Sequence, residues 1–356
     1  MRNTIFFLSL FGIFIIYNTS STLLAQDVVV GDTSSIVEGK AQDFYNSGVQ
    51  KIEAKNLNGA VEDFNQAIEL LPSFEKAYFN RGSVKYQLKN YNEAIVDFNK
   101  VVELNPDSNN AHFLRGRSYY ELGNTEAANK DFTRAVEIDA KNAEAYYYSG
   151  MLLFLEEKYK EAITQFDNAI RNKPDYAYAF NDRGSAKKKL DDIKGAIKDY
   201  EKAIIIDGKL SFAHNNLGSA YRANKEYELA IKSYSKAILL QDNYHIAYNN
   251  RGLAKLEKGD FKGAIKDFDE CIMLNPKYAF AFNNRASAKY KLEDYKGAVE
   301  DCNKAISLDK EYGAAYLNRG IAYEMLRQED KACEDWRKAA ELGLKNGKNF
   351  AQQICN

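Results

Sequence analysis

Histidine, cysteine and proline are scarce in this chain of 356 residues, which contains three, four and four of them respectively. So few histidines and cysteines leave little material for a zinc site or a histidine-based active site. Lysine and arginine total 49 against 50 aspartates and glutamates, which gives a formal net charge of −1. Because no basic excess attracts a phosphate backbone, we expect neither a metalloenzyme nor a nucleic-acid-binding protein.

The apolar run near the N-terminus is also short. Residues 5–17 make 13 residues, whereas a helix that spans a bilayer needs ~20. Arg2 precedes this run, and a polar patch and then Ala25 follow it, an order typical of a secretory signal. We predict that residues 1–25 are a signal peptide, that residues 26–40 are a flexible leader, and that the chain is secreted or lies in the periplasm or cell envelope. Membrane association would then require an uncleaved signal or a partner.

What the chain does have is a repeat of 34 residues. A small residue recurs at this step, an alanine follows it by twelve residues, and a bulky residue usually follows that alanine by four. The small residues are Gly48, Gly82, Gly116, Gly150, Gly184, Gly218, Gly252, Ala286 and Gly320. The alanines are Ala60, Ala94, Ala128, Ala162, Ala196, Ala230, Ala264, Ala298 and Ala332. The third series is Phe64, Phe98, Phe132, Phe166, Tyr200, Tyr234, Phe268, Cys302 and Trp336. Nine repeats therefore tile residues 41–346, and each is numbered here from position 1 to position 34.

Each repeat is expected to form two helices. In the seventh repeat, apolar residues fall at helical spacing on both sides of Gly259-Asp260, and Pro276 ends the second series. A small residue where paired helices cross lets the backbones approach, and an aromatic residue opposite fills the remaining space. Neither helix can bury its apolar stripe alone, so stability must come from stacking repeat on repeat.

The combination of a small residue at position 8, alanine at 20 and 27, an aromatic residue at 24 and proline at 32 resembles the tetratricopeptide repeat. The resemblance covers residues 41–346 and implies an all-α fold, a right-handed solenoid of nine helix-turn-helix units. It also implies a concave groove and a protein or extended peptide as partner. The sequence shows no phosphate loop and no nucleophile elbow, so we predict no cofactor, no metal and no enzymatic activity.

The nine repeats can also be compared with one another. Six of them carry arginine at position 7, and all six carry aspartate at position 23. The pairs are Arg81 with Asp97, Arg115 with Asp131, Arg183 with Asp199, Arg251 with Asp267, Arg285 with Asp301, and Arg319 with Asp335. Only one of the three repeats without this arginine keeps the aspartate, so we predict an ion pair between the two helices of one repeat.

In tetratricopeptide repeats, positions 2, 5, 6, 9, 12 and 13 face or border the concave side, and here the two halves of the chain differ. Position 5 holds Tyr45, Phe79, Phe113 and Tyr147, and then Asn181, Asn215, Asn249 and Asn283. Position 12 adds Tyr86, Tyr120 and Phe154, and then Lys188 and Arg222. Position 6 adds Asn216, Asn250, Asn284 and Asn318. We predict that these residues bind the partner, with rings in the first half and carboxamides in the second.

A row of carboxamides suits an extended peptide, because each offers both a donor and an acceptor to a main-chain amide. The row is similar to the asparagine ladder in the repeat region of O-linked N-acetylglucosamine transferase, whose catalytic domain has no counterpart here. Other interpretations stay open. Asparagine at position 6 is common in these repeats, and rings at helical spacing pack in cores more often than they bind ligands. A glycan would also suit rings beside amides, and a structural role in envelope assembly would use another surface.

All four cysteines lie in the last quarter of the chain, and an exported chain meets an oxidising compartment. Cys271 and Cys302 occupy core positions of their repeats. We predict that residues 347–356 form a short capping helix and that Cys333 bonds to Cys355, which would stabilise the cap by ~3 kcal/mol. The spacing does not fix the connectivity, so a bridge between Cys271 and Cys302 stays open.

Overall fold

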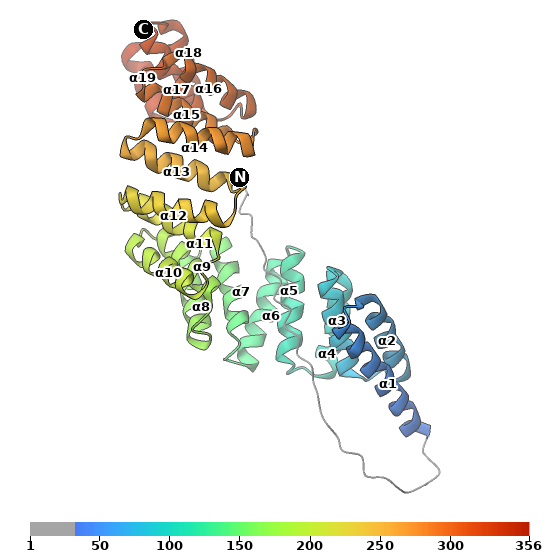
Figure 1. Cartoon of the computed structure of the whole chain (residues 1–356). Coiled ribbons are helices and arrows are strands. Elements are labelled where there is room, and N and C mark those ends of the chain that lie inside the picture. The colour runs from blue at the N-terminus through green and yellow to red at the C-terminus, as the bar shows by residue number, and fades with distance from the viewer. Residues whose placement is uncertain (1–32, 356) are drawn as a thin grey trace. The chain divides into compact units, whose positions relative to one another are not determined.

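The computed structural model describes residues 33–355, and every regular element in that range is an α-helix (Figure 1). The first helices of the repeats are α1 (Thr33–Glu53), α3 (Glu75–Gln87), α5 (Asn109–Glu121), α7 (Ala143–Leu155), α9 (Ala177–Lys189), α11 (Ser211–Ala223), α13 (His245–Lys258), α15 (Ala279–Lys291) and α17 (Gly313–Met325). The second helices are α2 (Leu57–Leu70), α4 (Tyr91–Leu104), α6 (Thr125–Ile138), α8 (Tyr159–Asn172), α10 (Ile193–Ile206), α12 (Tyr227–Leu240), α14 (Phe261–Leu274), α16 (Tyr295–Leu308) and α18 (Glu329–Glu341). A last helix, α19 (Lys345–Ile354), follows them. The predicted all-α fold of consecutive helix pairs is confirmed.

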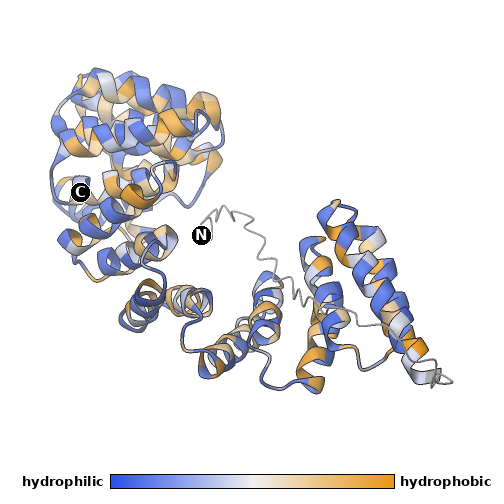
Figure 2. Cartoon of the chain, turned by 60° about the horizontal axis from the view of Figure 1, so that its bottom comes forward, coloured by the Kyte–Doolittle hydropathy of each residue, from blue (hydrophilic) through white to orange (hydrophobic). Residues whose placement is uncertain are grey.

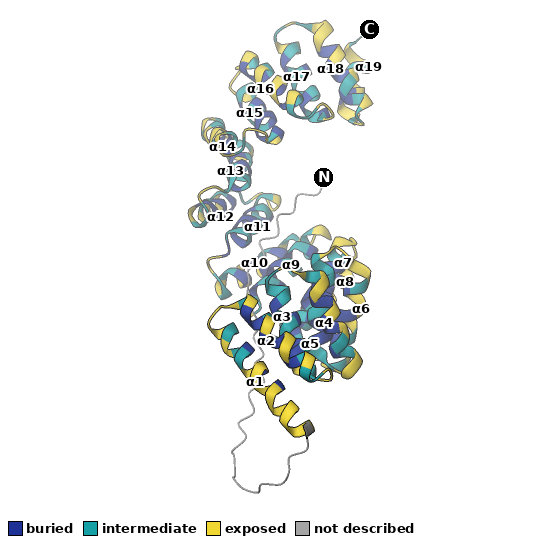
Figure 3. Ribbon diagram, turned by 90° about the vertical axis from the view of Figure 1, so that its right-hand side faces the viewer, coloured by how far each residue is buried: buried dark blue, intermediate teal, exposed yellow. Residues whose placement is uncertain are grey.

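The chain divides into two compact units, and the boundary lies between Lys158 and Tyr159, inside the fourth repeat. The described part of the first unit holds α1 to α7, and that of the second holds α8 to α19. Within each unit, buried residues lie where neighbouring helices face one another and exposed residues lie on the outer sides (Figure 3). Most helices carry hydrophobic and hydrophilic residues together (Figure 2). Each unit is therefore a stack of helices in which every helix depends on its neighbours for burial.

One backbone feature ends the first helix of all nine repeats. Position 15 has a positive φ in each, from 58° to 95°. Only Gly123 and Gly259 are glycines there; the other seven residues adopt the left-handed conformation despite their side chains. The second helix starts at once, and in several repeats an Asn or Asp side chain caps it, as Asp260 does by accepting a hydrogen bond from the backbone N–H of Gly263. This tight turn keeps the repeat at 34 residues.

The small residue at position 8 lies against the bulky residue at position 24 of the same repeat. A Cβ atom built on Gly252 would lie 2.6 Å from the Phe268 ring, and the corresponding distances in six other repeats are 2.6 to 3.0 Å, at Gly48, Gly82, Gly116, Gly184, Gly218 and Gly320. The eighth repeat, which has Ala286 at position 8, has the smaller Cys302 at position 24, and both are buried in one cluster. The exception in the glycine series is thus explained by its partner.

Helix α1 begins at Thr33, so the prediction of a flexible leader over residues 26–40 is wrong for residues 33–40. Once the packed part of α1 has formed, adding a turn costs little, which explains an extension whose residues 34–40 are exposed. Residues 26–32 and the predicted signal peptide lie outside the described residues. In residues 33–355, no helix is long and apolar enough to cross a membrane.

The predicted capping helix is present as α19, which packs on α18 at the end of the second unit. The rings of Phe350 and Trp336 lie 5.1 Å apart between centroids. Gly347 fits closely against Ala339 and the backbone of Trp336, where a Cβ atom would lie 2.8 Å from each. The last repeat is therefore covered by α19 on the side where a tenth repeat would stack.

Candidate binding surface

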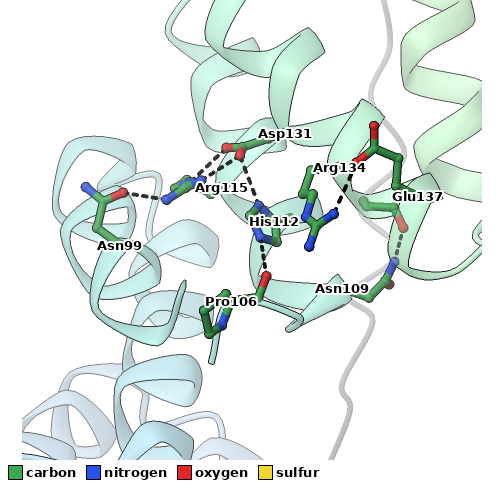
Figure 4. A network of polar contacts seen from close by, with 9 residues as sticks. Asn99, Pro106, Asn109, His112, Arg115, Asp131, Arg134 and Glu137 are labelled. Atoms are coloured by element: carbon green, nitrogen blue, oxygen red, sulfur yellow. Dashed lines mark hydrogen bonds and ion pairs between the residues drawn. The ribbon is translucent and has the colours of Figure 1, made fainter. Parts of the chain in front are cut away.

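The six predicted Arg–Asp pairs are confirmed, and every one has two hydrogen bonds. In the third repeat, Arg115 donates from Nε to Asp131 Oδ2 at 2.8 Å and from Nη2 to Asp131 Oδ1 at 2.6 Å (Figure 4). The other five pairs have the same arrangement. The aspartates are buried, so these pairs join the two helices of each repeat inside the protein.

The arginines make a further contact that the sequence pattern did not reveal. The third guanidinium nitrogen, Nη1, reaches position 25 of the preceding repeat, as Arg115 does with Asn99 Oδ1 at 2.9 Å (Figure 4). The acceptors in the other five repeats are Asn65, Asp167, Ser235, Asp269 and Asn303. Each of these arginines therefore connects three helices, two in its own repeat and one in the repeat before. These contacts within the protein explain the arginines and aspartates, and no ligand is needed to explain them.

The surroundings of these aspartates set their pKa values differently. Burial by itself raises the pKa of Asp131, but hydrogen bonds from Arg115 and His112 outweigh it and hold the pKa below its usual value. At Asp335 burial prevails over the pairing with Arg319, so the pKa of that carboxyl is raised. His112 is buried, with Nδ1 3.2 Å from Asp131 Oδ1 and Nε2 3.0 Å from the carbonyl oxygen of Pro106, which gives it a packing role inside the repeat.

The structure does not support the prediction that the position 5 rings line a groove. All four are buried, with at most 8% of their surface exposed, and three of them pack against the position 24 ring of their own repeat. These residues are Tyr45, Phe79, Phe113 and Tyr147. Position 5 faces the neighbouring helices rather than solvent, because the side chain at position 24 approaches it from the second helix.

The position 12 rings in the first unit are partly covered as well. The guanidinium of Arg117 lies over the rings of Tyr86 and Tyr148, at 4.9 and 5.1 Å from their centroids. The rings of Tyr120 and Tyr148 meet edge to face at 5.7 Å. The first unit thus uses many of its aromatic residues for internal packing, while Tyr86 and Tyr120 stay half-buried.

The asparagines of the second unit form an ordered ladder. At each step, Nδ2 of the position 6 residue donates to Oδ1 of the position 5 residue in the preceding repeat, at 2.9 to 3.0 Å. The steps are Asn216 to Asn181, Asn250 to Asn215, Asn284 to Asn249, and Asn318 to Asn283. The position 5 members are buried, which corrects their prediction as partner-binding residues, while the position 6 members are half-buried. The ladder therefore links the first helices α9, α11, α13, α15 and α17.

The direction of these hydrogen bonds determines which atom of each position 6 asparagine is left for a ligand. Each position 6 asparagine uses its amide nitrogen inward, and its Oδ1 atom accepts no hydrogen bond within the described part of the chain. These oxygens are not enclosed either, because none is among the buried polar atoms without a partner. The same inward bond occurs once in the first unit, where Asn80 donates to the Tyr45 hydroxyl at 3.0 Å. In the second unit, the first-helix surface, defined as the face carrying Asn216, Asn250, Asn284 and Asn318, presents a row of hydrogen-bond acceptors.

The two predicted cations at position 12 lie on the same helices. Lys188 donates to Ser219 Oγ, and Arg222 pairs with Glu257 through Nη1 at 2.6 Å.

Cys333 and Cys355 are within disulfide-bonding distance, with 5.6 Å between their Cα atoms, whereas Cys271 and Cys302 are separate, buried thiols. Burial raises the pKa of each of these two thiols to about 12, which makes them unreactive near neutral pH. No group of metal-ligating residues occurs in the part of the chain that the structure describes.

Helix pairs of constant length that stack on one another define an α-solenoid. Models of the tetratricopeptide repeat match residues 75–108, 113–177, 177–209, 211–244, 245–278 and 281–312. Because these stretches cover more than half of the 356 residues, the chain belongs to the tetratricopeptide repeat family. Such a fold is a scaffold for protein interaction.

The chain was also compared with solved structures. A tetratricopeptide repeat protein from Parabacteroides merdae ATCC 43184 is 17% identical over 70% of this chain and 99% of its own, with a TM-score of 0.57. A chain of the APC/C hetero-tetramer Cut9–Hcn1 is 15% identical over 89% of this chain and 76% of its own, also at 0.57. MamA is 28% identical over 46% of this chain and 96% of its own, with a TM-score of 0.42. No curated protein matched the chain. The first two likenesses show the fold alone.

Proposed function

We propose that this protein is a non-catalytic scaffold that binds an extended peptide, or an extended segment of a protein, along the first-helix surface of its second unit. The observation that carries the proposal is the orientation of the ladder. Four carboxamides are held by inward bonds, and their outward oxygens recur once per repeat. Main-chain N–H groups of an extended chain are the donors that such a row matches.

The expected affinity is moderate. A neutral hydrogen bond contributes about 0.5–1.5 kcal/mol net, so four of them supply only part of what a specific complex needs. The ladder is, however, already ordered by its contacts between repeats, so little conformational entropy is lost at these side chains on binding. Neighbouring side chains on the same helices must then select the sequence of the peptide.

The triple variant Asn216→Ala, Asn250→Ala, Asn284→Ala tests the proposal. We expect the wild-type chain to bind members of a synthetic array of unstructured 15-residue peptides, and the triple variant to lose at least tenfold in affinity for them, because three acceptors are removed. Fluorescence anisotropy with the peptides from the array measures both.

Asn80→Ala is the matched control, because it removes the same kind of inward bond outside the ladder. Circular dichroism and urea unfolding establish that each variant remains folded. Equal binding by the wild type and the triple variant, or an array without any binder, would show that the ladder does not serve this function.

A second candidate function, assembly through the opposite side of the repeats, is favoured by one observation. At position 29 of repeats five, six and seven, the apolar side chains of Ile205, Leu239 and Met273 are 76%, 71% and 67% exposed. Most other repeats have a charged residue there. If the protein assembles through this surface, the wild type and the triple ladder variant should have the same association state. Analytical sedimentation of these two proteins measures it.

We also propose that the chain is exported and that its last two cysteines, Cys333 and Cys355, form a disulfide bond. The order of residues at the N-terminus and the close approach of Cys333 and Cys355 support this. For protein purified from its native cell envelope and alkylated in denaturant, which exposes the thiols of Cys271 and Cys302, the intact mass should correspond to a chain that starts at Gln26 and carries two alkylated thiols. A chain that retains residue 1, or that carries four alkylated thiols, would contradict the proposal.

A further inference from the structure

The second helices of repeats five, six and seven carry an exposed face that the packing of the repeats does not explain. It is called here the second-helix surface and consists of positions 18, 22, 25, 26 and 29 of α10, α12 and α14, all exposed except Ser235. These positions follow one another at intervals of about one helical turn, so they share one face of each helix. The first helices of successive repeats contact one another, whereas the second helices pack mainly on first helices. The second-helix surface therefore lies on the other side of the stack from the ladder.

Two positions of this surface change together along the chain. Position 22 is lysine and position 29 is a large apolar residue in repeats five, six and seven, and no other repeat combines the two. The lysines are Lys198, Lys232 and Lys266, and the apolar row consists of Ile205, Leu239 and Met273, which are 76%, 71% and 67% exposed. Because neither series packs in the core, the stability of the repeats does not account for the combination.

The second-helix surface also has an excess of positive charge. Positions 18, 22 and 26 supply seven lysines, against four acidic residues on the whole face. In the part of the chain that the structure describes, no carboxylate lies within ion-pair distance of these lysines. Three of the acids, Glu201, Glu228 and Asp269, already accept hydrogen bonds or ion pairs from side chains outside the face. A chain with a formal net charge of −1 thus gathers unpaired cations beside an apolar row.

The residue types favour a lipid surface over other occupants. Protein interfaces are enriched in arginine and aromatic residues and depleted of lysine, whereas the second-helix surface has neither an arginine nor an aromatic residue. A second copy bound through the same face would place lysines opposite lysines. A nucleic acid would pair with the lysines but leave the apolar row in water.

We propose that the second-helix surface binds a bilayer that contains anionic lipids. The lysines contact lipid phosphates, and the apolar row enters between the headgroups, the arrangement that suits proteins lying on a membrane. The lysine stems can extend along the apolar side chains while their ammonium groups reach the phosphates. This peripheral contact needs neither an uncleaved signal nor a partner protein. It leaves the ladder of the second unit facing away from the lipid, so a peptide still has access to it.

Sedimentation with lipid vesicles tests the proposal. It uses the exported protein and vesicles of equal parts phosphatidylglycerol and phosphatidylcholine, and each variant is compared with the wild type so that any contribution of the N-terminal residues is the same. We expect the triple variant Lys198→Gln, Lys232→Gln, Lys266→Gln to lose at least tenfold in affinity, and added salt to weaken wild-type binding. The triple variant Ile205→Ser, Leu239→Ser, Met273→Ser should lose severalfold, because the apolar row no longer enters the headgroup layer.

The matched control for charge is the triple variant Lys130→Gln, Lys141→Gln, Lys160→Gln. It removes three exposed lysines outside the second-helix surface and gives the same net charge as the first variant. It should bind the vesicles as the wild type does. Circular dichroism establishes that each variant remains folded.

A fluorescent label on the apolar row reports insertion directly. In Leu239→Cys the new thiol is exposed, whereas Cys271 and Cys302 are buried, so a nitrobenzoxadiazole group attaches selectively to the native protein. Its emission should rise severalfold with the anionic vesicles. The same label in Lys189→Cys, on the first helix of repeat five, should stay in water and not respond.

The outcomes separate a membrane from the other occupants. Equal binding by the wild type and both triple variants, or a label at Leu239→Cys that stays in water, overturns the proposal. Loss in the lysine variant alone shows a surface that attracts any polyanion, which also overturns it. If the wild type ignores vesicles and self-associates, and the serine variant does not, the surface joins copies of the chain. The triple ladder variant should bind vesicles as the wild type does, so peptide binding and membrane binding can fail separately.

Discussion

At the scale of single residues, the arginines at position 7 show what internal comparison can and cannot reveal. Arginine and aspartate vary together across nine copies in one chain, so the sequence alone is enough to infer their pairing. The bond to position 25 of the preceding repeat escapes this comparison, because the acceptor there is asparagine, aspartate or serine. Covariation finds a pair of fixed residue types; it misses an acceptor that several side chains supply equally well.

At position 5, the sequence pattern was noticed but the direction of the side chains was predicted wrongly. Its change from rings to asparagines along the chain is plain in the sequence, but the direction of these side chains is not, since periodicity alone does not say which flank of a helix meets its neighbours. A signal does exist. Position 5 asparagines are each followed, thirty-five residues later, by an asparagine at position 6, as Asn181 is by Asn216. This spacing joins adjacent repeats, and it could have indicated the contact.

The coupling between positions 8 and 24 can be tested in the eighth repeat. Phenylalanine in place of Cys302 should meet the Cβ atom of Ala286 and cost about 1–3 kcal/mol of unfolding free energy through overpacking. Ala286→Gly alone should cost about 1 kcal/mol, because glycine destabilises a helix interior. The double variant, which recreates the pair found as Gly252 and Phe268, should be more stable than the sum of the two effects predicts, by at least about 1 kcal/mol. Urea unfolding of the four proteins measures this, and strictly additive effects would contradict the coupling.

At the scale of helices, the element count and most boundaries are predictable. The 34-residue step fixes where the first helices from α3 to α17 begin, and in several repeats an Asn or Asp before the second helix caps it, as Asp260 does. The left-handed residue at position 15 is not predictable from composition, because seven of its nine occupants are ordinary side chains such as Lys89 and Asp191. The stacked helices on either side impose that conformation and offset its strain.

The helices at the two ends of the array also differ in how far the sequence predicts them. Phe350, which packs on Trp336, and the spacing of Cys333 and Cys355 are the sequence signals of helix α19. The extension of α1 to Thr33 has no such signal, since residues 34–40 are exposed and contribute little to the core. Helices are predictable where burial selects the residues, and their exposed extensions are not.

At the scale of the whole molecule, the dominant property is that contacts are local. In the second unit, each helix packs mainly against those immediately before and after it in sequence, and the arginine and asparagine bonds reach no farther than the adjacent repeat. Stability should then be a sum of repeat and nearest-neighbour terms rather than the property of one core. Such an array can present a long, repetitive surface, which is what an extended ligand requires.

A single overpacked repeat tests this locality. In Gly252→Val, the new Cβ atom would lie 2.6 Å from the ring of Phe268 and force α13 from α14. Amide hydrogen exchange should show lost protection in those two helices, a smaller loss in the adjoining α12 and α15, and unchanged protection in α17 and α18. Gly208→Ala is the control, because its nearest atom, the carbonyl oxygen of Ile204, lies at 3.5 Å. If protection instead fell equally from α9 to α18, the second unit would unfold as one cooperative body, and its repeats could not act as independent steps of a binding surface.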